Sequence, residues 1–235
     1  MLCGLEGRML HVEINGVHLA VDVVRHKRSK RMRLRYSPIG KLRLSVPWHA
    51  KACDIQRFLD HSVPWLQERV QQKYEPVLCS HGATIPILGR EYIVHTNGAV
   101  KRGVSFEGNQ LVLRGPENCI DIIVRSFLRQ ELARFCAEQS HQYAAALGVH
   151  VQTIRVRNMR SRWGSCSASG NLSFSYHLIF APQEIVQYVC AHEVAHLREM
   201  NHSPAFWQEV AKLYPNYKNA RAWLKKEGKS LFRYS

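Results

Sequence analysis

The sequence has no pair of cysteines close enough together to form a metal-binding or disulfide motif. Its seven cysteines include no C-x-x-C pair, and the two nearest, Cys119 and Cys136, are 17 residues apart. An odd number of widely spaced thiols is typical of reduced cysteines in the cytosol. We therefore expect neither a disulfide framework nor a zinc ribbon, and we predict a cytoplasmic protein.

Long apolar segments are also missing. No hydrophobic run approaches the roughly 20 residues needed to cross a membrane. The first ten residues carry Glu6 and Arg8, unlike the apolar centre of a secretory signal. We therefore expect no export signal, no membrane-spanning helix and no membrane partner.

Acidic residues are few: 18 Asp and Glu stand against 33 Lys and Arg, a formal net charge of +15. Such an excess favours polyanionic partners such as nucleic acid or nucleotides, and it is equally compatible with a basic surface that binds nothing. Seven basic residues and no acid occur in one short stretch, at Arg25, Lys27, Arg28, Lys30, Arg31, Arg33 and Arg35.

This basic stretch ends in an alternating pattern, in which Arg31, Arg33 and Arg35 are separated by Met32 and Leu34. A period of two predicts a β-strand with an arginine face and an apolar face. Two interpretations remain open: a surface that binds nucleic acid or phosphate, and an ordinary solvated strand face.

Short alternating segments dominate the first half of the chain. Residues 11–24, 85–94 and 104–113 alternate apolar and polar side chains and are separated by glycine-containing turns. We predict a β-rich, basic N-terminal domain with short helices over residues 8–115, followed by a second domain over residues 116–235.

One segment of the first half has a helical pattern instead. Residues 51–74 are predicted to be helical, with Pro64 starting a second helix rather than lying inside one. The large apolar side chains of Trp48 and Trp65 are predicted to belong to the core.

The second half mixes helices with strands. An apolar stripe predicts a long helix over residues 118–147, with Gly148 as its stop signal. A loop of small residues follows at 161–170, and an alternating strand at 172–178. Pro182 then suits the first turn of another helix. The predicted fold class is α+β.

That last helix carries an H-E-x-x-H pattern, formed by His192, Glu193 and His196, and His202 follows six residues later. Residues four apart lie on one helix face, about one turn apart, so both imidazoles can reach one metal ion. Glu193 is turned roughly 100° away, which suits a base that takes a proton from metal-bound water. The pattern is typical of zinc hydrolases, and two ordinary histidines on an amphipathic helix are the alternative.

The helix must end before His202 if this third histidine is to return to the ion. Asn201 tolerates the left-handed conformation that such a turn often needs. Ser203 and Pro204 are then predicted as the cap and first residue of a new helix.

Three segments resemble the YgjP-like metallopeptidase family, whose members are small zincins related to the SprT/Spartan-type DNA-repair proteases. They are Arg157 to Ser167, which contains W-G-S-C, Ala191 to His196, and Asn201 to Trp207. Weaker likeness extends upstream through the basic stretch and the segment from Leu88 to Tyr92, so the resemblance covers about residues 20–228. The resemblance implies one zinc ion held by His192, His196 and His202, Glu193 as the base, and cleavage of peptide bonds. It also implies a zincin-like C-terminal metallopeptidase domain preceded by a β-rich N-terminal domain.

Two departures from known patterns matter. Family members usually have Asn-Trp-Arg-Leu where this chain has Ser175-Tyr176-His177-Leu178, so a role for that arginine is lost or moved to His177. The histidine spacing also matches metzincins, but Glu199 stands where they keep a glycine. Membership of the metzincins is therefore not supported.

Four residues are predicted to contact the substrate. Arg162, Tyr176 and His177 carry groups that can stabilise an oxyanion, and Trp163 begins a segment that is either a wall of the site or a loop that pins a hairpin to the core. The strand at 172–178 is expected to pair, as an edge strand, with an extended polypeptide.

Two other functions remain open. Some relatives are described as nucleoside triphosphate pyrophosphatases, and Arg157, Arg160 and Arg162 are suited to holding phosphates, although the chain has no phosphate-cradling glycine loop. The other is a nucleic-acid-binding protein with a structural metal. A structural zinc site normally has four protein ligands, which leave no position open for water. We therefore expect a polypeptide or nucleotide substrate, and nucleic acid as a further partner of the basic surface.

Overall fold

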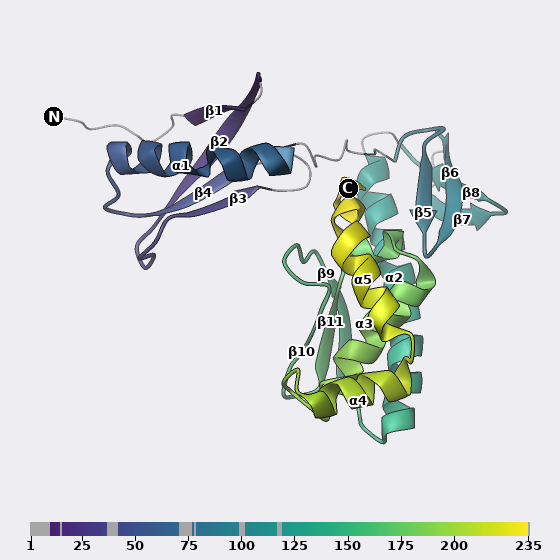
Figure 1. Ribbon diagram of the computed structural model, residues 1–235. Helices are drawn as coiled ribbons and strands as arrows, with labels where there is room; N and C mark the ends of the chain where they lie inside the picture. The colour runs from purple at the N-terminus through teal and green to yellow at the C-terminus, as the bar shows by residue number, and fades with distance from the viewer. Residues whose placement is uncertain are drawn as a thin grey trace. The chain divides into compact units, whose positions relative to one another are not determined.

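The computed structural model describes residues 10–14, 16–36, 42–70, 77, 79–98, 102–116 and 119–234 (Figure 1). The chain divides into two compact units, residues 1–76 and 77–235. Among the described residues, no helix has the length and apolar character needed to cross a membrane.

The first unit is a four-stranded sheet with one helix. In spatial order the strands are β1 (Leu10–Ile14), β2 (Val17–His26), β4 (Leu42–Pro47) and β3 (Arg33–Tyr36). β1 and β2 form an antiparallel hairpin, β2 runs parallel to β4, and β3 runs antiparallel to β4. Helix α1 (Ala52–Val70) follows the last strand in sequence.

Helix α1 packs its apolar side chains on one face of this sheet. Leu59 and Leu66 of the helix are buried with strand residues such as Leu44. The predicted break at Pro64 is wrong, because α1 continues through that residue. Packing on both sides of Pro64 outweighs the hydrogen bond that proline cannot make.

The two tryptophans of the first unit behave differently. Trp65 is partly buried against the core of the unit, as predicted. Trp48 is 63% exposed, so its predicted place in the core is wrong. It lies beyond the end of β4, in a turn that α1 does not cover.

The second unit begins with a small sheet, ordered β5 (Thr84–Ile87), β6 (Arg90–Asn97), β8 (Gln110–Arg114) and β7 (Gly103–Glu107). Its buried residues, including Ile85, Val94 and Leu111, share one apolar core with the long helix α2 (Ile120–Leu147). The division between compact units therefore falls at 76/77 and not at the predicted 115/116. As predicted, α2 ends at Gly148, which is left-handed with φ of 64°.

A second small sheet lies beside the central helices. Its order is β10 (Gly164–Cys166), β11 (Asn171–Ser175) and β9 (Thr153–Arg157). β11 is therefore the middle strand and not the predicted edge, and it ends at Ser175, where a 3-10 helix, η2 (Tyr176–Phe180), begins. The edge strands are β9 and β10, and β10 lies within the predicted loop.

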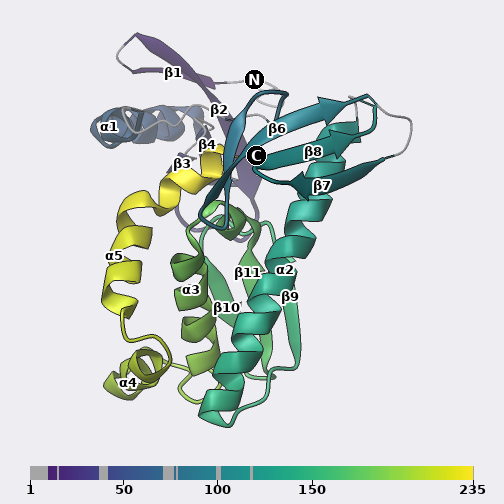
Figure 2. The same ribbon diagram turned by 90° about the vertical axis from the view of Figure 1, so that its right-hand side faces the viewer.

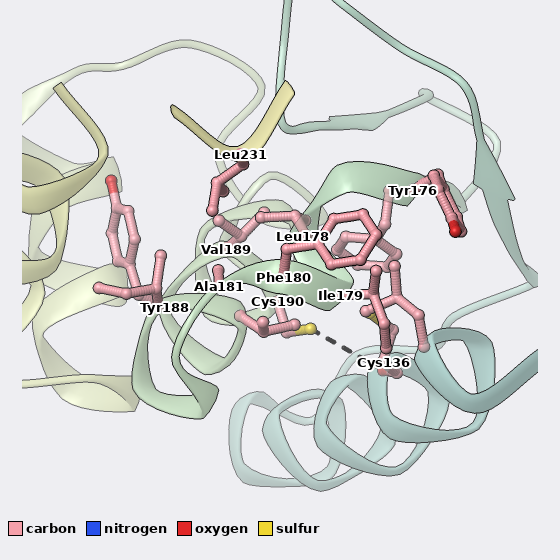
Figure 3. Packing of buried hydrophobic residues seen from close by; sticks show 14 of the residues in the cluster. Cys136, Tyr176, Leu178, Ile179, Phe180, Ala181, Tyr188, Val189, Cys190 and Leu231 are labelled. Carbon is pink, nitrogen blue, oxygen red and sulfur yellow. Dashed lines mark hydrogen bonds between the residues drawn. The ribbon is translucent and has the colours of Figure 1, made fainter. Parts of the chain in front are cut away.

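The remaining elements are α3 (Gln183–Ala195), α4 (Pro204–Leu213), α5 (Tyr217–Glu227) and the 3-10 helix η3 (Gly228–Arg233). Figure 2 shows α3 between α2 and α5, and α3 also contacts β10. Figure 3 shows the packing of α3 on α2, where the buried Cys190 Sγ lies 4.0 Å from the carbonyl oxygen of Cys136. A helix buried on several sides gives the residues at its C-terminal end fixed positions.

Candidate metal centre

Three histidines converge at the C-terminal end of α3. His192 and His196 are one turn apart, and their ring centroids are separated by 5.0 Å. His202 lies 5.1 Å from the first ring and 4.8 Å from the second. One nitrogen from each ring can be chosen so that all three lie within 4.8 Å of one another.

The turn after α3 brings His202 back towards the helix. Ser203 donates its backbone N–H to Asn201 Oδ1 over 3.0 Å, and its own hydroxyl caps α4 by accepting from the N–H of Phe206. The predicted left-handed conformation at Asn201 is wrong, because Leu88 is the one non-glycine residue with positive φ in the described part. The side-chain hydrogen bond of Asn201 forms the turn instead.

The hydrogen bonding of the rings suits a metal ion. His196 Nδ1 lies 2.9 Å from the carbonyl oxygen of Glu199, which can only accept, so this nitrogen carries the proton and Nε2 keeps its lone pair. The Nε2 atoms of His192 and His202 are 3.1 Å apart. Two nitrogens bound to one tetrahedral zinc ion would be separated by about 3.3 Å. The donor set therefore fits zinc.

The two helical histidines are held in the neutral form that binds metal. Burial, together with the smaller effects of the neighbouring His196, His202 and Arg221, lowers the pKa of His192 to about 3. Burial also lowers the pKa of His196. His192 Nδ1 is buried and has no hydrogen-bonding partner among the described residues.

Glu193 lies next to these rings and is only 5% exposed. Burial raises the pKa of its carboxyl group to about 8, and the nearby Arg162 opposes this rise. A divalent cation at the histidines would lower it as well. The backbone of Gly164 packs directly against this side chain.

The histidines and Glu193 open into a pocket of about 810 Å³. Strand β10 forms one wall with all three of its residues. Three cationic side chains line the pocket, namely Arg162, Arg221 and Lys225. Trp163 and Met200 contribute apolar surface. The pocket can therefore receive an extended chain with a negative charge.

The predicted substrate residues divide into two pairs. Arg162 and Trp163 line this pocket. Tyr176 and His177 do not, because both are buried in η2, and the ring of His177 packs 4.5 Å from that of Phe232. Their alternating sequence predicted a strand, whereas all five residues of η2 are buried.

Trp163 lies between the pocket and the C-terminal segment. Trp163 lines the pocket, and its ring also lies 5.3 Å from that of Phe232, between centroids, and against Gly228. A Cβ atom at Gly228 would lie 2.9 Å from Trp163 Cζ2, so glycine leaves the space that the indole fills. Trp163 therefore forms part of the pocket wall and also packs against the C-terminal segment.

Sequence reasoning missed the part of the pocket that comes from α5. Arg221 and Lys225 are four residues apart and so lie on one face of that helix. The guanidinium of Arg221 lies 4.8 Å from the ring centroid of Trp207, which in turn contacts His192 and His202. The spacing of Arg221 and Lys225 indicates that they share one face of the helix, but it does not indicate that this face points into the pocket.

Comparison with known proteins places the chain in a family. No curated protein matches it. It is similar to the solved structure of the metallopeptidase zymogen abylysin of Pyrococcus abyssi, with 24% identity, and to that of jannalysin of Methanocaldococcus jannaschii, with 15%. Each similarity covers 39% of this chain and 95% of the other, with a TM-score of 0.36. The family model described as YgjP-like, metallopeptidase domain matches residues 30–227, so the chain belongs to the YgjP-like metallopeptidase family.

Proposed function

We propose that this protein is a zinc-dependent peptidase in which His192, His196 and His202 hold one zinc ion and Glu193 is the general base. The proposal is carried by one observation: three convergent ring nitrogens lie beside a buried carboxylate in a pocket of about 810 Å³. Membership of a metallopeptidase family supports a hydrolase of this class.

A zinc ion held by three neutral imidazoles would polarise the carbonyl of a peptide bond and lower the pKa of a water molecule beside it. Three histidines are the ligand number of catalytic zinc sites, whereas structural sites are usually closed by four protein ligands. Cys166 lines the same pocket but is not part of the histidine cluster. This argues against a purely structural metal.

Glu193 accepts a proton from the attacking water and returns it to the leaving amine. The carboxylate is held in place because the backbone of Gly164 packs against it and the surrounding side chains bury it. Arg162 lines the same pocket and is a donor for the oxyanion of the tetrahedral intermediate. These roles need no other titratable side chain at the reacting carbonyl.

The substrate is bound as an extended strand along β10. This strand is hydrogen-bonded to β11 on one side and is the edge of its sheet on the other. Gly164, Ser165 and Cys166 all line the pocket. An extended peptide can add to such an edge through main-chain hydrogen bonds.

A second candidate function is hydrolysis of a nucleoside triphosphate. The presence of Arg162, Arg221 and Lys225 in the pocket favours an anionic substrate, which phosphates would satisfy. Against this function, an all-histidine donor set suits zinc better than magnesium, which prefers oxygen ligands. We therefore rank it second.

One experiment separates the two functions. The zinc-loaded protein is assayed on an unfolded polypeptide, with and without single-stranded DNA, and on nucleoside triphosphates. Glu193→Gln is compared with Glu184→Gln, an exposed residue of the same helix. We expect peptide products from the wild type and from Glu184→Gln, and none from Glu193→Gln. Release of phosphate or pyrophosphate without peptide products would overturn the proposal.

A further inference from the structure

We propose that the first unit binds single-stranded nucleic acid, with phosphates on a basic surface of its sheet and a base stacked on Trp48. This surface lies entirely within residues 20–50, and the proposal does not depend on the metal centre.

The sheet of the first unit has one covered face and one open face. Leu42, Leu44 and Val46 of β4 point towards α1 and are buried, whereas the intervening Arg43 is exposed. The same alternation continues in β3, where Arg33 and Arg35 are exposed. The face opposite α1 is therefore polar and open.

Arginines from two strands meet on this open face. Arg35 is the direct partner of Arg43 in the antiparallel pair β3–β4, and Arg33 lies two residues along the same strand. Arg43 is paired with Asp22 at 2.7 Å, whereas Arg33 and Arg35 form no ion pair within the described part of the chain. We call Arg33, Arg35 and Arg43 the arginine face.

The connection between β2 and β3 extends this positive surface. Its four basic side chains are exposed, and we call them the basic loop: Lys27, Arg28, Lys30 and Arg31. Ten Lys and Arg and no acid occur between Val23 and Cys53. Glu13 of β1 is exposed on the same open face, but β1 and β3 are opposite edges of the sheet, so two strands lie between Glu13 and Arg33 or Arg35.

Trp48 lies at the end of the sheet where the basic loop begins. The register pairs His26 with Pro47, so the last residue of β2 lies beside the residue before Trp48. Arg25 fixes the turn by donating from Nη1 to the carbonyl oxygens of Trp48, at 2.7 Å, and Ala50, at 3.0 Å. The indole is therefore held beside the basic loop while remaining 63% exposed.

A cationic surface next to an exposed indole matches the chemistry of a single-stranded nucleic acid. Phosphates pair with arginine and lysine, and an unpaired base stacks on an aromatic ring without regard to sequence. The bases of a duplex are already stacked on one another, and an acidic protein has no regular series of flat rings to offer. Single-stranded DNA or RNA is the occupant that uses both features.

The test measures binding of the full-length protein to a fluorescent 12-nucleotide oligothymidine over a range of salt concentrations. Each phosphate contact contributes about −0.7 to the slope of log K against log salt for a single strand. Arg33→Gln with Arg35→Gln should therefore make the slope shallower by about 1.4. Trp48→Ala should weaken binding about five- to hundred-fold without changing the slope.

The control removes the same charge elsewhere. Arg57→Gln with Arg134→Gln neutralises two exposed arginines, one on α1 and one on α2, each of which has an acidic neighbour. We expect this variant, and Glu193→Gln, to bind like the wild type. Equal affinity and slope in the two double variants would overturn the proposal. So would competition by polyglutamate or duplex DNA as effective as by the single strand.

Discussion

Gly164 and Glu193 are in direct contact, and no side chain can be added at residue 164 without displacing the glutamate. A Cβ atom there would lie 2.6 Å from both Cγ and Cδ of Glu193. This contact joins the edge strand β10 to the proposed general base. The backbone that would bind the substrate therefore also sets the position of the carboxylate.

Replacing Gly164 by alanine should disable the peptidase without removing its metal. The added methyl group would push the carboxylate of Glu193 out of its place, and loss of a positioned base typically costs about 100-fold or more in rate. Zinc binding should persist, because the three atoms nearest to the new methyl group all belong to Glu193 and none to a histidine. The measurements are kcat on an unfolded polypeptide and the zinc content of the purified variant.

Gly98→Ala is the matched control, because a Cβ atom at residue 98 would meet no atom within 4 Å. It should retain wild-type rates. A Gly164→Ala variant that is equally active would show that the carboxylate can move without consequence, and Glu193 would then not be the base.

Removal of zinc should lower the thermal stability of the second unit. A metal present at about 1,000 times its dissociation constant stabilises the folded state by about 4 kcal/mol, which corresponds to roughly 10 °C in the midpoint of a domain of this size. We expect a chelator to lower the thermal midpoint of the wild type and added zinc to restore it.

His202→Ala should abolish this response to the chelator, because it removes one of the three proposed zinc ligands. The ring of His202 is exposed, so its loss should not disturb the core. His141→Ala removes an exposed histidine of α2 and should leave the response unchanged. If His202→Ala still bound one zinc ion with wild-type affinity, His202 would not be a ligand.

The cluster of three histidines was predictable because its signal is local. His192, Glu193 and His196 are fixed relative to one another by helix geometry alone, and Ser203 caps the following helix as expected. The turn between the two helices was predicted in outline only. A hydrogen bond from the backbone N–H of Ser203 to the side-chain oxygen of Asn201 replaced the left-handed residue that such turns often use.

The walls of the pocket were harder to predict because they depend on contacts between distant segments. Strand β10 has three residues, too few for a pattern with a period of two to stand out from a loop of small residues. Arg221 and Lys225 reach the pocket only because α5 packs on α3. No local rule indicates that packing.

The prediction of a strand over residues 172–178 was also wrong at its end, where the segment is buried on every side. Tyr176 and His177 continue the alternation of β11, but the chain turns into a 3-10 helix after Ser175. The predicted boundary at 115/116 failed for a related reason. Strand content changes there, whereas the shared core of Leu113 and Val124 continues across it.

The burial of His177 predicts a loss of stability in mild acid. Burial lowers the pKa of this ring to about 4, with Arg160 and Arg125 adding to the effect. Between about pH 6.5 and pH 4, the unfolded chain binds a proton that the native ring does not. The free energy of unfolding should therefore fall as the pH falls through this range, by up to about 3 kcal/mol.

His177→Gln should lack this contribution, because the amide does not titrate. The measurement is chemical denaturation of the wild type and of His177→Gln at several pH values. The quantity to compare is the difference between their free energies of unfolding. It should be constant above about pH 6.5 and should shrink below it. His141→Gln controls for loss of an exposed histidine, and parallel profiles for the wild type and His177→Gln would contradict the prediction.

Arg221 and Lys225 should give the peptidase a preference for acidic substrates. Both line the pocket from one face of α5, and a partly exposed charge pair contributes up to about 1 kcal/mol, or fivefold in binding. The comparison uses two peptides that differ by Glu or Gln next to the cleaved bond. Arg221→Gln with Lys225→Gln should raise KM for the acidic peptide about fivefold and leave that of the neutral peptide unchanged.

Lys226→Gln is the control, since Lys226 is exposed and lies 3.4 Å from Glu227. If the wild type and the double variant preferred the acidic peptide equally, these cations would not select the substrate. Loss of activity on both the acidic and the neutral peptide would instead indicate damage to the histidine cluster.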